Sequence, residues 1–286
     1  MLAAYILLFL LFLVLPLGAL IIKSVQDSKG HFIGLSNYAL YLKEPTLFQS
    51  FFNSLFIAIV STIFVVVFAF LFAYAITRTC MPFKGFFGLI ALIPLLSPSI
   101  LAAIALVYWF GNKGILKALL FGHSIYGPIG IILASIYWTF PHALMILSTS
   151  LSLSDSRLYE AAEVLKTSKL RAFLTITIPG ARYGIISTTF VVFTQVFTDF
   201  GVPKVIGGNY NVLATDIYKE VVGMQNFQMG AVISLVLLIP AMVAFFIDQY
   251  SRKKQISLLT SRSVVFNPKK RWGVDIMMFG YSSIIA

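Results

Sequence analysis

The side chains that could carry out chemistry in this chain are few, and they do not form a recognisable catalytic set. The chain has one cysteine, Cys80, and three histidines, His31, His123 and His142, that show no metal-ligand spacing. One cysteine can form neither an internal disulfide nor a metal site by itself. No glycine-rich phosphate loop, pair of catalytic carboxylates or nucleophile elbow is present in the sequence. We therefore expect a protein that is not itself an enzyme and that holds no cofactor or metal.

Charged residues gather instead in one segment, residues 155–182, between two long apolar stretches. Within it Leu158, Ala161, Ala162 and Leu165 recur at i, i+3, i+4 and i+7, the spacing of one face of an α-helix. Either Asp155 or Ser156 can cap the start of that helix. The two alanines would let a partner approach the backbone closely. The alternative is an amphipathic hairpin that rests on lipid headgroups.

A second short helix is expected after a turn at Thr167 and Ser168, where Ser168 offers an N-cap. Leu170, Phe173 and Leu174 form its apolar face. Pro179 is expected to end it, because proline lacks the backbone N–H that a helix interior requires. The segment therefore reads as a hairpin of two short helices.

The elements around this hairpin are those of a membrane protein. Hydrophobic residues make up 59% of the 286 and charged residues 11%, whereas a soluble domain carries about 25% charged residues. Continuous apolar runs near 20 residues suit helices that cross about 30 Å of hydrocarbon, and they argue against a barrel of alternating strands. We expect an all-α membrane protein with six spans, at residues 1–22, 51–77, 85–111, 126–150, 183–200 and 229–247.

The distribution of lysine and arginine predicts the orientation. Fourteen of the 21 fall in the loops on the side of the hairpin, or in the tail after residue 250, and seven fall on the opposite side. This asymmetry predicts that the hairpin and both chain ends are cytoplasmic. It also explains the net charge of +11 without nucleic-acid binding, because the basic residues lie beside span ends rather than on one folded face.

The hairpin carries a motif. Glu160, Ala161 and Ala162 are followed, at a fixed distance, by Ile176, Thr177, Ile178 and Pro179. This pattern resembles the EAA signature of binding-protein-dependent ABC importer permeases, which reads E-A-A, three residues, G, nine residues, I-x-L-P. The spacing matches throughout. Lys166 stands where the family usually has glycine and Ile178 where it has leucine, and the first departure matters more because glycine eases the turn between the two helices.

The resemblance implies a six-span ABC importer permease fold and a mechanism. The hairpin would be a coupling helix that lies in a groove of a separate cytoplasmic ATP-binding subunit. Glu160 would make a polar contact at the groove edge, Ala161 and Ala162 would allow close packing, and Pro179 would fix the exit into the fifth span. Lys166 and Ile176 complete the candidate ATPase-coupling set. The other implied partners are a periplasmic solute-binding protein, a second permease half and membrane lipid.

Two further stretches, residues 126–147 and 198–231, resemble the iron(III), thiamine and phosphonate branch of these permeases. The narrower similarity is to a 2-aminoethylphosphonate importer permease, and it rests on residues 200–204, 211–218 and 141–147. In such systems the substrate is selected mainly by the binding protein.

A few polar or helix-breaking residues lie within the spans and are candidates for a pathway or gate. Pro94, Ser97 and Pro98 disrupt the third span, which fits either a gate or irregular packing. Asp199, at the outer end of the fifth span, either marks a pathway or caps the chain there or pairs with Lys204. Gln195, one turn below, either lines a pathway or forms a hydrogen bond between helices.

The expected domain organisation is a permease domain at residues 1–250, with the EAA loop at 151–182, followed by a basic linker at 251–271. Residues 272–286 turn apolar again and are expected to begin a further span of a second permease half. The alternatives to an importer subunit are an ion-gradient-driven secondary transporter or channel subunit, which would favour buried ionisable pairs or inverted repeats, and a non-transporting scaffold. The expected location is the bacterial inner membrane.

Overall fold

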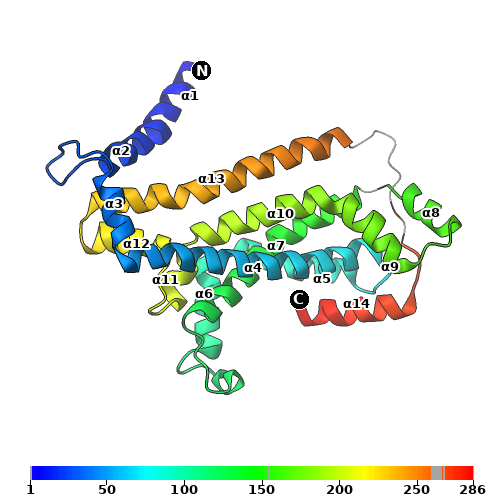
Figure 1. The fold of residues 1–286 in the computed structure, drawn as a ribbon. Helices are drawn as coiled ribbons and strands as arrows, with labels where there is room; N and C mark the ends of the chain where they lie inside the picture. The colour runs from blue at the N-terminus through cyan, green and yellow to red at the C-terminus, as the bar shows by residue number, and fades with distance from the viewer. Residues whose placement is uncertain (1, 154, 259–265, 267, 286) are drawn as a thin grey trace.

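The computed structural model describes residues 2–153, 155–258, 266 and 268–285, and the regular elements of this part are helices (Figure 1). One isolated antiparallel bridge joins Gln26 and Phe32. In chain order the elements are α1 (Leu2–Phe9), η1 (Leu10–Val14), α2 (Leu15–Ser24), α3 (Ser36–Lys43), α4 (Pro45–Arg78), α5 (Lys84–Leu92), η2 (Ile93–Leu96), α6 (Ser99–Phe110), η3 (Lys117–Leu120), α7 (Pro128–Ser152), α8 (Arg157–Val164), α9 (Lys169–Ala172), η4 (Phe173–Thr177), α10 (Ile178–Thr198), α11 (Gly201–Ile206), α12 (Leu213–Tyr218), η5 (Lys219–Gly223), α13 (Phe227–Leu258) and α14 (Trp272–Ile285). The segments η1, η4 and η5 are π-helical, and η2 and η3 are 3₁₀-helical.

Five helices of the described chain are long and apolar enough to cross a membrane, and a bent pair makes a sixth candidate. The five are Ala4–Ser24, Pro45–Arg78, Pro128–Ser152, Lys169–Thr198 and Phe227–Ser251. The prediction of an all-α membrane protein is therefore confirmed. Each of the six predicted spans overlaps one of these candidates.

The third predicted span is not straight. Helix α5 with η2 meets α6 at an angle of 104°. The break lies where the sequence predicts it, at Pro94, Ser97 and Pro98. Ser97 is extended, as a residue before proline tends to be, and the Ser97 hydroxyl donates a hydrogen bond of 2.9 Å to the carbonyl of Pro94. The second arm, α6, runs away from the axis of the bundle (Figure 1).

Helices α4, α7, α10 and α13 lie side by side and form the bundle core (Figure 1). Small buried residues allow the close approach, among them Ala69 and Ala73 on α4, Ala143 on α7 and Ala181 on α10. Helices α7 and α10 approach closely at Gly184 on α10, where an added Cβ would lie 2.3 Å from the Cβ of Ser150 on α7. No side chain fits between these two helices there.

We predict that Gly184→Val destabilises the bundle by about 2–4 kcal/mol, because α7 and α10 must separate to admit the side chain. The measurement is the thermal unfolding midpoint of the purified protein. Gly88→Ala on α5 is the control, since a Cβ there meets no atom within 4 Å, and its midpoint should stay the same or rise. Equal behaviour of the two variants would contradict the prediction.

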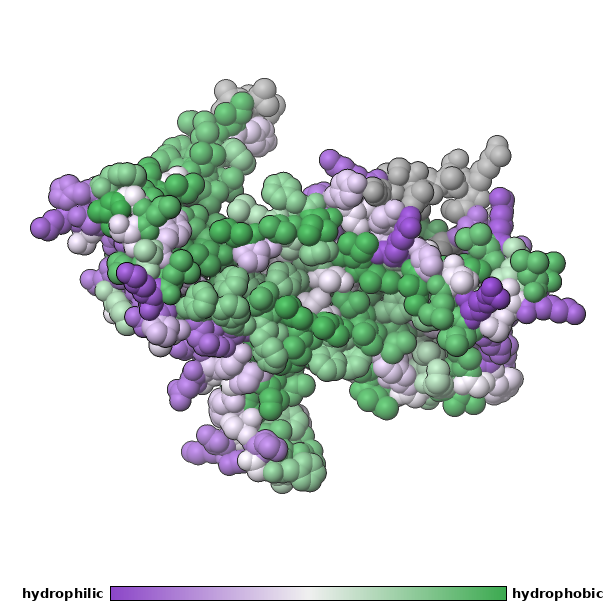
Figure 2. Space-filling view, viewed as in Figure 1, coloured by the Kyte–Doolittle hydropathy of each residue, from purple (hydrophilic) through white to green (hydrophobic). Residues whose placement is uncertain are grey.

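The surface of the described chain matches a membrane setting. Apolar side chains cover the middle of the bundle, and hydrophilic ones gather at its two ends (Figure 2). We call the end that carries residues 151–182 the hairpin end; α4 and α7 finish there and α14 starts there. The loops around residues 25–44, 111–127 and 199–226 lie at the opposite end.

The first span and α14 differ in how they pack. The span Ala4–Ser24 points away from the bundle, and its most apolar 18-residue window has no residue buried within the chain (Figure 1). Helix α14 begins at Trp272, the residue at which the sequence predicts a further span, and it packs on α4 and α5. Tyr281 donates a hydrogen bond of 2.7 Å to the carbonyl of Phe68 on α4. The buried carboxylate of Asp275 accepts from the backbone N–H groups of Cys80 and Arg271, both at 2.8 Å.

The prediction that Pro179 ends a short helix is wrong. The helix that starts at Lys169 continues without a break to Thr198, so the fifth span starts 14 residues earlier than expected. The π-helical turn Phe173–Thr177 explains this, because the N–H of Ile178 donates to the carbonyl of Phe173, five residues back, and widens the helix just before the proline ring. Pro179 therefore lies inside one continuous helix, and the widened turn before it accommodates its ring and its missing N–H.

Candidate functional site

A turn joins the two arms of the hairpin. Its geometry explains why the EAA motif usually has glycine at the position that Lys166 occupies in this chain. After α8, the N–H of Thr167 donates to the carbonyl of Ala162 at 2.9 Å, and the N–H of Lys166 donates to the carbonyl of Glu163 at 3.0 Å. These two bonds form a Schellman motif, which needs a left-handed residue at the position of Lys166. Lys166 has a φ of 52°, so it adopts this conformation despite its side chain. The expected N-cap is confirmed, because the Ser168 hydroxyl accepts from the N–H of Arg171 at 3.3 Å.

We predict that Lys166→Gly raises the free energy of unfolding by about 0.5–1 kcal/mol, because glycine relieves the strain of the left-handed backbone. Thermal unfolding of the purified protein measures the gain. Lys166→Ala is the matched control: it removes the same charge but keeps the Cβ. If the alanine variant gains as much as the glycine variant, the charge of Lys166 and not its backbone is the cause.

Helix α8 presents an apolar face outward. Of the four residues predicted to form one apolar stripe, three are exposed and one, Ala162, is buried. Ala162 is buried against the bundle, whereas Ala161 and Glu160 are exposed. Leu158, Val164 and Leu165 remain 55%, 82% and 77% exposed. The expectation that Ala161 and Ala162 share one surface is therefore wrong, since the helix turns Ala162 inward. An exposed apolar patch of this kind, at the end of a helical bundle, is typical of an interaction surface.

Helix α8 is held to the bundle by one arginine that the sequence does not single out. Arg78, the last residue of α4, is 7% exposed. Its guanidinium lies over the ring of Tyr159 on α8 at 5.0 Å and over the ring of Phe266 at 4.3 Å. Its Nη2 donates to the carbonyl of Leu151 at the end of α7. Arg78 thus joins two core helices, the hairpin and the segment before α14.

Two further contacts fix the inner side of the hairpin. The hydroxyls of Tyr159 and Thr177 are 3.0 Å apart and share a hydrogen bond, which connects α8 to the π-helical turn. Lys269 Nζ lies 2.6 Å from Glu163 Oε2. The hydrogen bond from Lys269 lowers the pKa of the Glu163 carboxyl. Both side chains are exposed, so this ion pair adds little to stability.

The motif residues on the second arm lie along the bundle. Ile176 is half-buried within the π-helical turn, and Pro179 follows it on an exposed face. All six residues of the predicted coupling set therefore lie on the hairpin or on the helix that it joins. The structure brings Glu160, Ala161 and Lys166 to the open face, and it places Ala162 and Ile176 on the packed side.

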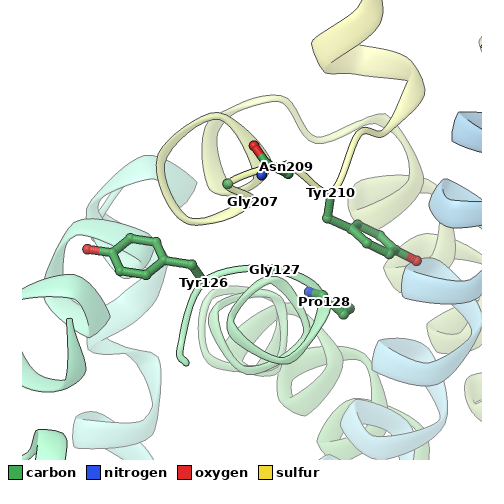
Figure 3. A pocket seen from close by; sticks show the side chains of 7 residues that line it. Tyr126, Gly127, Pro128, Gly207, Asn209 and Tyr210 are labelled. Carbon is green, nitrogen blue, oxygen red and sulfur yellow. The ribbon is translucent and has the colours of Figure 1, made fainter. Parts of the chain in front are cut away.

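At the opposite end, the two stretches 126–147 and 198–231 meet in a pocket of about 490 Å³ (Figure 3). Its walls are Tyr126, Gly127 and Pro128 before α7 and Gly207 to Tyr210 after α11. The N–H of Gly127 donates to the carbonyl of Ile206 at 2.8 Å, which ties the two loops together. Tyr126 and Tyr210 lie on either side, with Asn209 above (Figure 3). The lining is uncharged, and the hydroxyls of Tyr126 and Tyr210 point away from its centre (Figure 3).

Asp199 lies close to the break of the bent pair. Its Oδ1 accepts a hydrogen bond of 2.6 Å from the hydroxyl of Ser99, and its Oδ2 accepts from the N–H of Val202 at 2.9 Å. Asp199 thus caps the start of α11 and connects it to α6. It does not pair with Lys204, whose ammonium lies 4.1 Å from the centre of the Tyr218 ring. The partner of Asp199, Ser99, directly follows the candidate gate residues Pro94, Ser97 and Pro98 in the chain.

Gln195, the remaining candidate, is half-buried on α10. Its buried Oε1 has no hydrogen-bond partner among the described residues. A hydrogen bond between helices of the described chain therefore does not account for this atom. The described residues also contain no group of three or more His, Cys, Asp or Glu side chains placed to hold a metal ion.

Comparison with protein families gives one match that covers more than half of the chain. Residues 81–256 match the family described as binding-protein-dependent transport system inner membrane component. The matched region contains the bent pair, α7, the hairpin and α10 to α13.

Curated relatives resemble most of this chain. A protein of Haemophilus influenzae and one of Actinobacillus pleuropneumoniae, both named as ferric transport system permease proteins, are 29% and 28% identical over 253 and 255 residues, or 86% of this chain in each case. The chain spans 40% and 37% of their lengths, which is less than half. The spermidine/putrescine transport system permease protein PotB of Escherichia coli is 26% identical over 72% of this chain and 78% of its own.

Solved structures share the fold. A bacterial ABC transporter that imports the acidic polysaccharide alginate matches with a TM-score of 0.69 at 17% identity, over 91% of this chain and 95% of the other. An amino acid ABC transporter matches with a TM-score of 0.55 at 14% identity, over 77% of this chain and 98% of the other. The architecture is therefore that of ABC importer permeases.

Proposed function

Because this chain belongs to the family of binding-protein-dependent transport system inner membrane components, we propose that it is the membrane-spanning part of an ATP-driven importer. A separate ATPase subunit hydrolyses ATP in the cytoplasm, and a periplasmic binding protein delivers the solute. The observation that carries this proposal is the hairpin, whose apolar face at Leu158, Ala161 and Leu165 is exposed at one end of the bundle.

The outward face of α8 lies in a groove of the ATPase. Ala161 gives the close approach, and Glu160 makes the polar contact at its edge. Lys166 sets the turn, and Ile176 and Pro179 lie on the helix that receives the motion. Ala162 supports α8 from inside rather than touching the partner. This division of roles rests on the exposure of Glu160 and Ala161 and the burial of Ala162.

Two measurements test the proposal. Affinity purification of the tagged chain from its native membrane should recover an ATP-binding subunit in stoichiometric amount. Uptake by proteoliposomes that contain the assembly and its binding protein should stop when ATP hydrolysis is blocked and should continue when ion gradients are collapsed. Uptake that follows an ion gradient and ignores ATP would instead identify a secondary transporter.

The translocated solute is small and polar, and iron(III) is the first candidate because two relatives are named for ferric transport. 2-Aminoethylphosphonate and thiamine are the candidates from the branch that residues 198–231 resemble, and the PotB similarity adds polyamines. Competition of each compound with labelled iron(III) for uptake decides among them. A competitor that abolishes iron(III) uptake, and is itself accumulated, would replace iron(III) as the substrate.

The solute pathway runs between this chain and a second permease half. The exposed first span supplies a surface for that half. In this organisation residues 1–250 form the permease domain and residues 272–286 begin the second half. Residues 251–271 are the linker that connects the two. Part of that linker, at 259–265 and 267, lies outside the described residues.

Asp199 and the bent pair at Pro94, Ser97 and Pro98 form the gate near the opposite end of the bundle. The hydrogen bond between Ser99 and Asp199 supports this role, because it connects α6 to the end of α10 and the start of α11. The hairpin end faces the cytoplasm of a bacterial cell, in accord with the excess of lysine and arginine on that side. The expectation that both chain ends are cytoplasmic does not fit α14, which starts at the hairpin end and runs back along α4.

A further inference from the structure

A pocket of about 570 Å³ lies behind the hairpin, on the side that faces the bundle. It is bounded by α8 and its turn, by the end of α4, and by the segment that precedes α14. Ala162, the inward residue of the motif, forms part of its wall. Glu160 and Lys166, which also border the open face of the hairpin, line it as well, so the pocket reaches from the bundle to the edge of that face.

The pocket is strongly basic. Its polar lining contains three more cationic than anionic side chains: Arg78, Lys166, Lys169, Lys269 and Arg271 against Glu160 and Glu163. We call it the cationic pocket. One cation, Lys269, pairs with Glu163. Lys166, Lys169 and Arg271 form no ion pair within 4 Å with any described residue, although the charge of Arg271 contributes to lowering the pKa of Glu163. The charges of Lys166 and Lys169 are available to a bound anion.

The basic residues that line the pocket come from distant parts of the chain. Lys169 belongs to the start of the fifth span and Arg271 to the segment before α14, about a hundred positions later, and both line the same two adjoining pockets. The second pocket, of about 410 Å³, continues past them to Trp272. Cations from distant parts of the sequence thus converge on one concave surface.

The rigid frame of the pocket suits a phosphate group. Arg78 is nearly fully buried and is fixed by two aromatic rings and a backbone carbonyl. Arginine presents a fork of N–H donors that matches phosphate oxygens, and lysine adds a point charge. The volume lies in the range of small-molecule sites, about 300–1,000 Å³, so the ligand can be larger than a bare phosphate ion.

From this geometry we propose that the cationic pocket binds a phosphate-bearing ligand. Two sources have this chemistry. The pocket adjoins the ends of membrane spans, within reach of an anionic phospholipid headgroup, and it is also open to soluble phosphate compounds. Binding at this site does not depend on the coupling role of α8.

The test uses the assembled transporter in nanodiscs and follows its thermal unfolding midpoint. In the first arm the lipid is phosphatidylcholine, and inorganic phosphate replaces chloride at constant ionic strength. In the second arm phosphate is absent, and phosphatidylglycerol replaces part of the phosphatidylcholine. We expect a rise on the order of 2–4 °C in at least one arm. A rise in the first arm identifies a soluble ligand, and a rise in the second arm alone identifies a lipid headgroup.

The double variant Lys169→Gln with Arg271→Gln should lose at least half of that rise. Arg182→Gln is the matched control, because Arg182 is an exposed cation at the same end of the bundle that does not line the pocket. It should keep the full rise. For each variant, the rise is measured from its own unfolding midpoint in chloride and phosphatidylcholine. A change in the stability of the variant itself therefore does not affect the comparison.

No rise in either arm overturns the proposal. A rise that the double variant keeps in full, or that Arg182→Gln loses to the same extent, also overturns it, because the anion would then act through general surface charge.

Discussion

Replacing Ala161 with arginine should abolish binding of the ATPase subunit while membrane insertion stays intact. Ala161 is exposed on the outward face of α8, so the new side chain meets no atom of the folded chain that it must displace. In a docked complex it would place a bulky cation in a closely packed interface. Overpacking together with an uncompensated charge costs about 3 kcal/mol or more, which weakens binding at least about 100-fold.

Co-purification of the ATPase with the variant measures the loss, and ATP-driven uptake should fall with it. Ala161→Ser is the control, because serine is small and leaves the close approach possible. Ala162→Arg should behave differently from Ala161→Arg, since Ala162 is buried and its replacement destabilises the hairpin itself. A variant Ala161→Arg that still binds the ATPase and supports uptake would remove the coupling role from α8.

Replacing Arg78 with alanine should destabilise the hairpin end by about 2–4 kcal/mol and uncouple ATP hydrolysis from uptake. The variant loses two contacts with aromatic rings and a hydrogen bond to Leu151, and it leaves a space in a buried site. Cation–π contacts at desolvated sites contribute about 2 kcal/mol. Helix α8 would then be held by the Tyr159–Thr177 hydrogen bond and by an exposed ion pair.

Thermal unfolding and the ratio of ATP hydrolysed to solute imported measure the two effects of Arg78→Ala. Arg182→Ala is the control: Arg182 also lies over a tyrosine ring, at 4.5 Å from Tyr183, but it is exposed. Its loss should change stability by less than about 0.5 kcal/mol. If Arg182→Ala is as damaging as Arg78→Ala, or if Arg78→Ala retains full coupling, Arg78 does not hold the hairpin in its working position.

The spans and the hairpin could be predicted because their signals are local. A continuous apolar run of about 20 residues predicts a membrane helix by itself, and all six predicted runs overlap a candidate span. Ser168 is a strong N-cap residue in any context, and it acts as one. The prolines at 94 and 98 break the third span for the same local reason, although the angle of 104° depends on packing against other elements.

The errors arise where a distant contact or a rare backbone state decides. Pro179 ends no helix because a π-helical turn precedes it, and such turns have no sequence signal of their own. The rotation of α8, which buries Ala162 and exposes Ala161, depends on Tyr159 and Arg78. Contacts among Arg78, Tyr159 and Phe266 join residues far apart in the chain, and neither hydrophobic periodicity nor a motif reports them.

The unbroken helix from Lys169 to Thr198 has a mechanical consequence. Its 30 residues form a stiff lever about 45 Å long. One end leaves the turn at Lys166, and the other stops beside Asp199 and its hydrogen bond to Ser99. A tilt of only about 10° at the turn moves the far end by about 8 Å, enough to part that hydrogen bond. If the hairpin carries the proposed coupling stroke, this helix would turn a small tilt there into a larger displacement at the opposite end of the bundle.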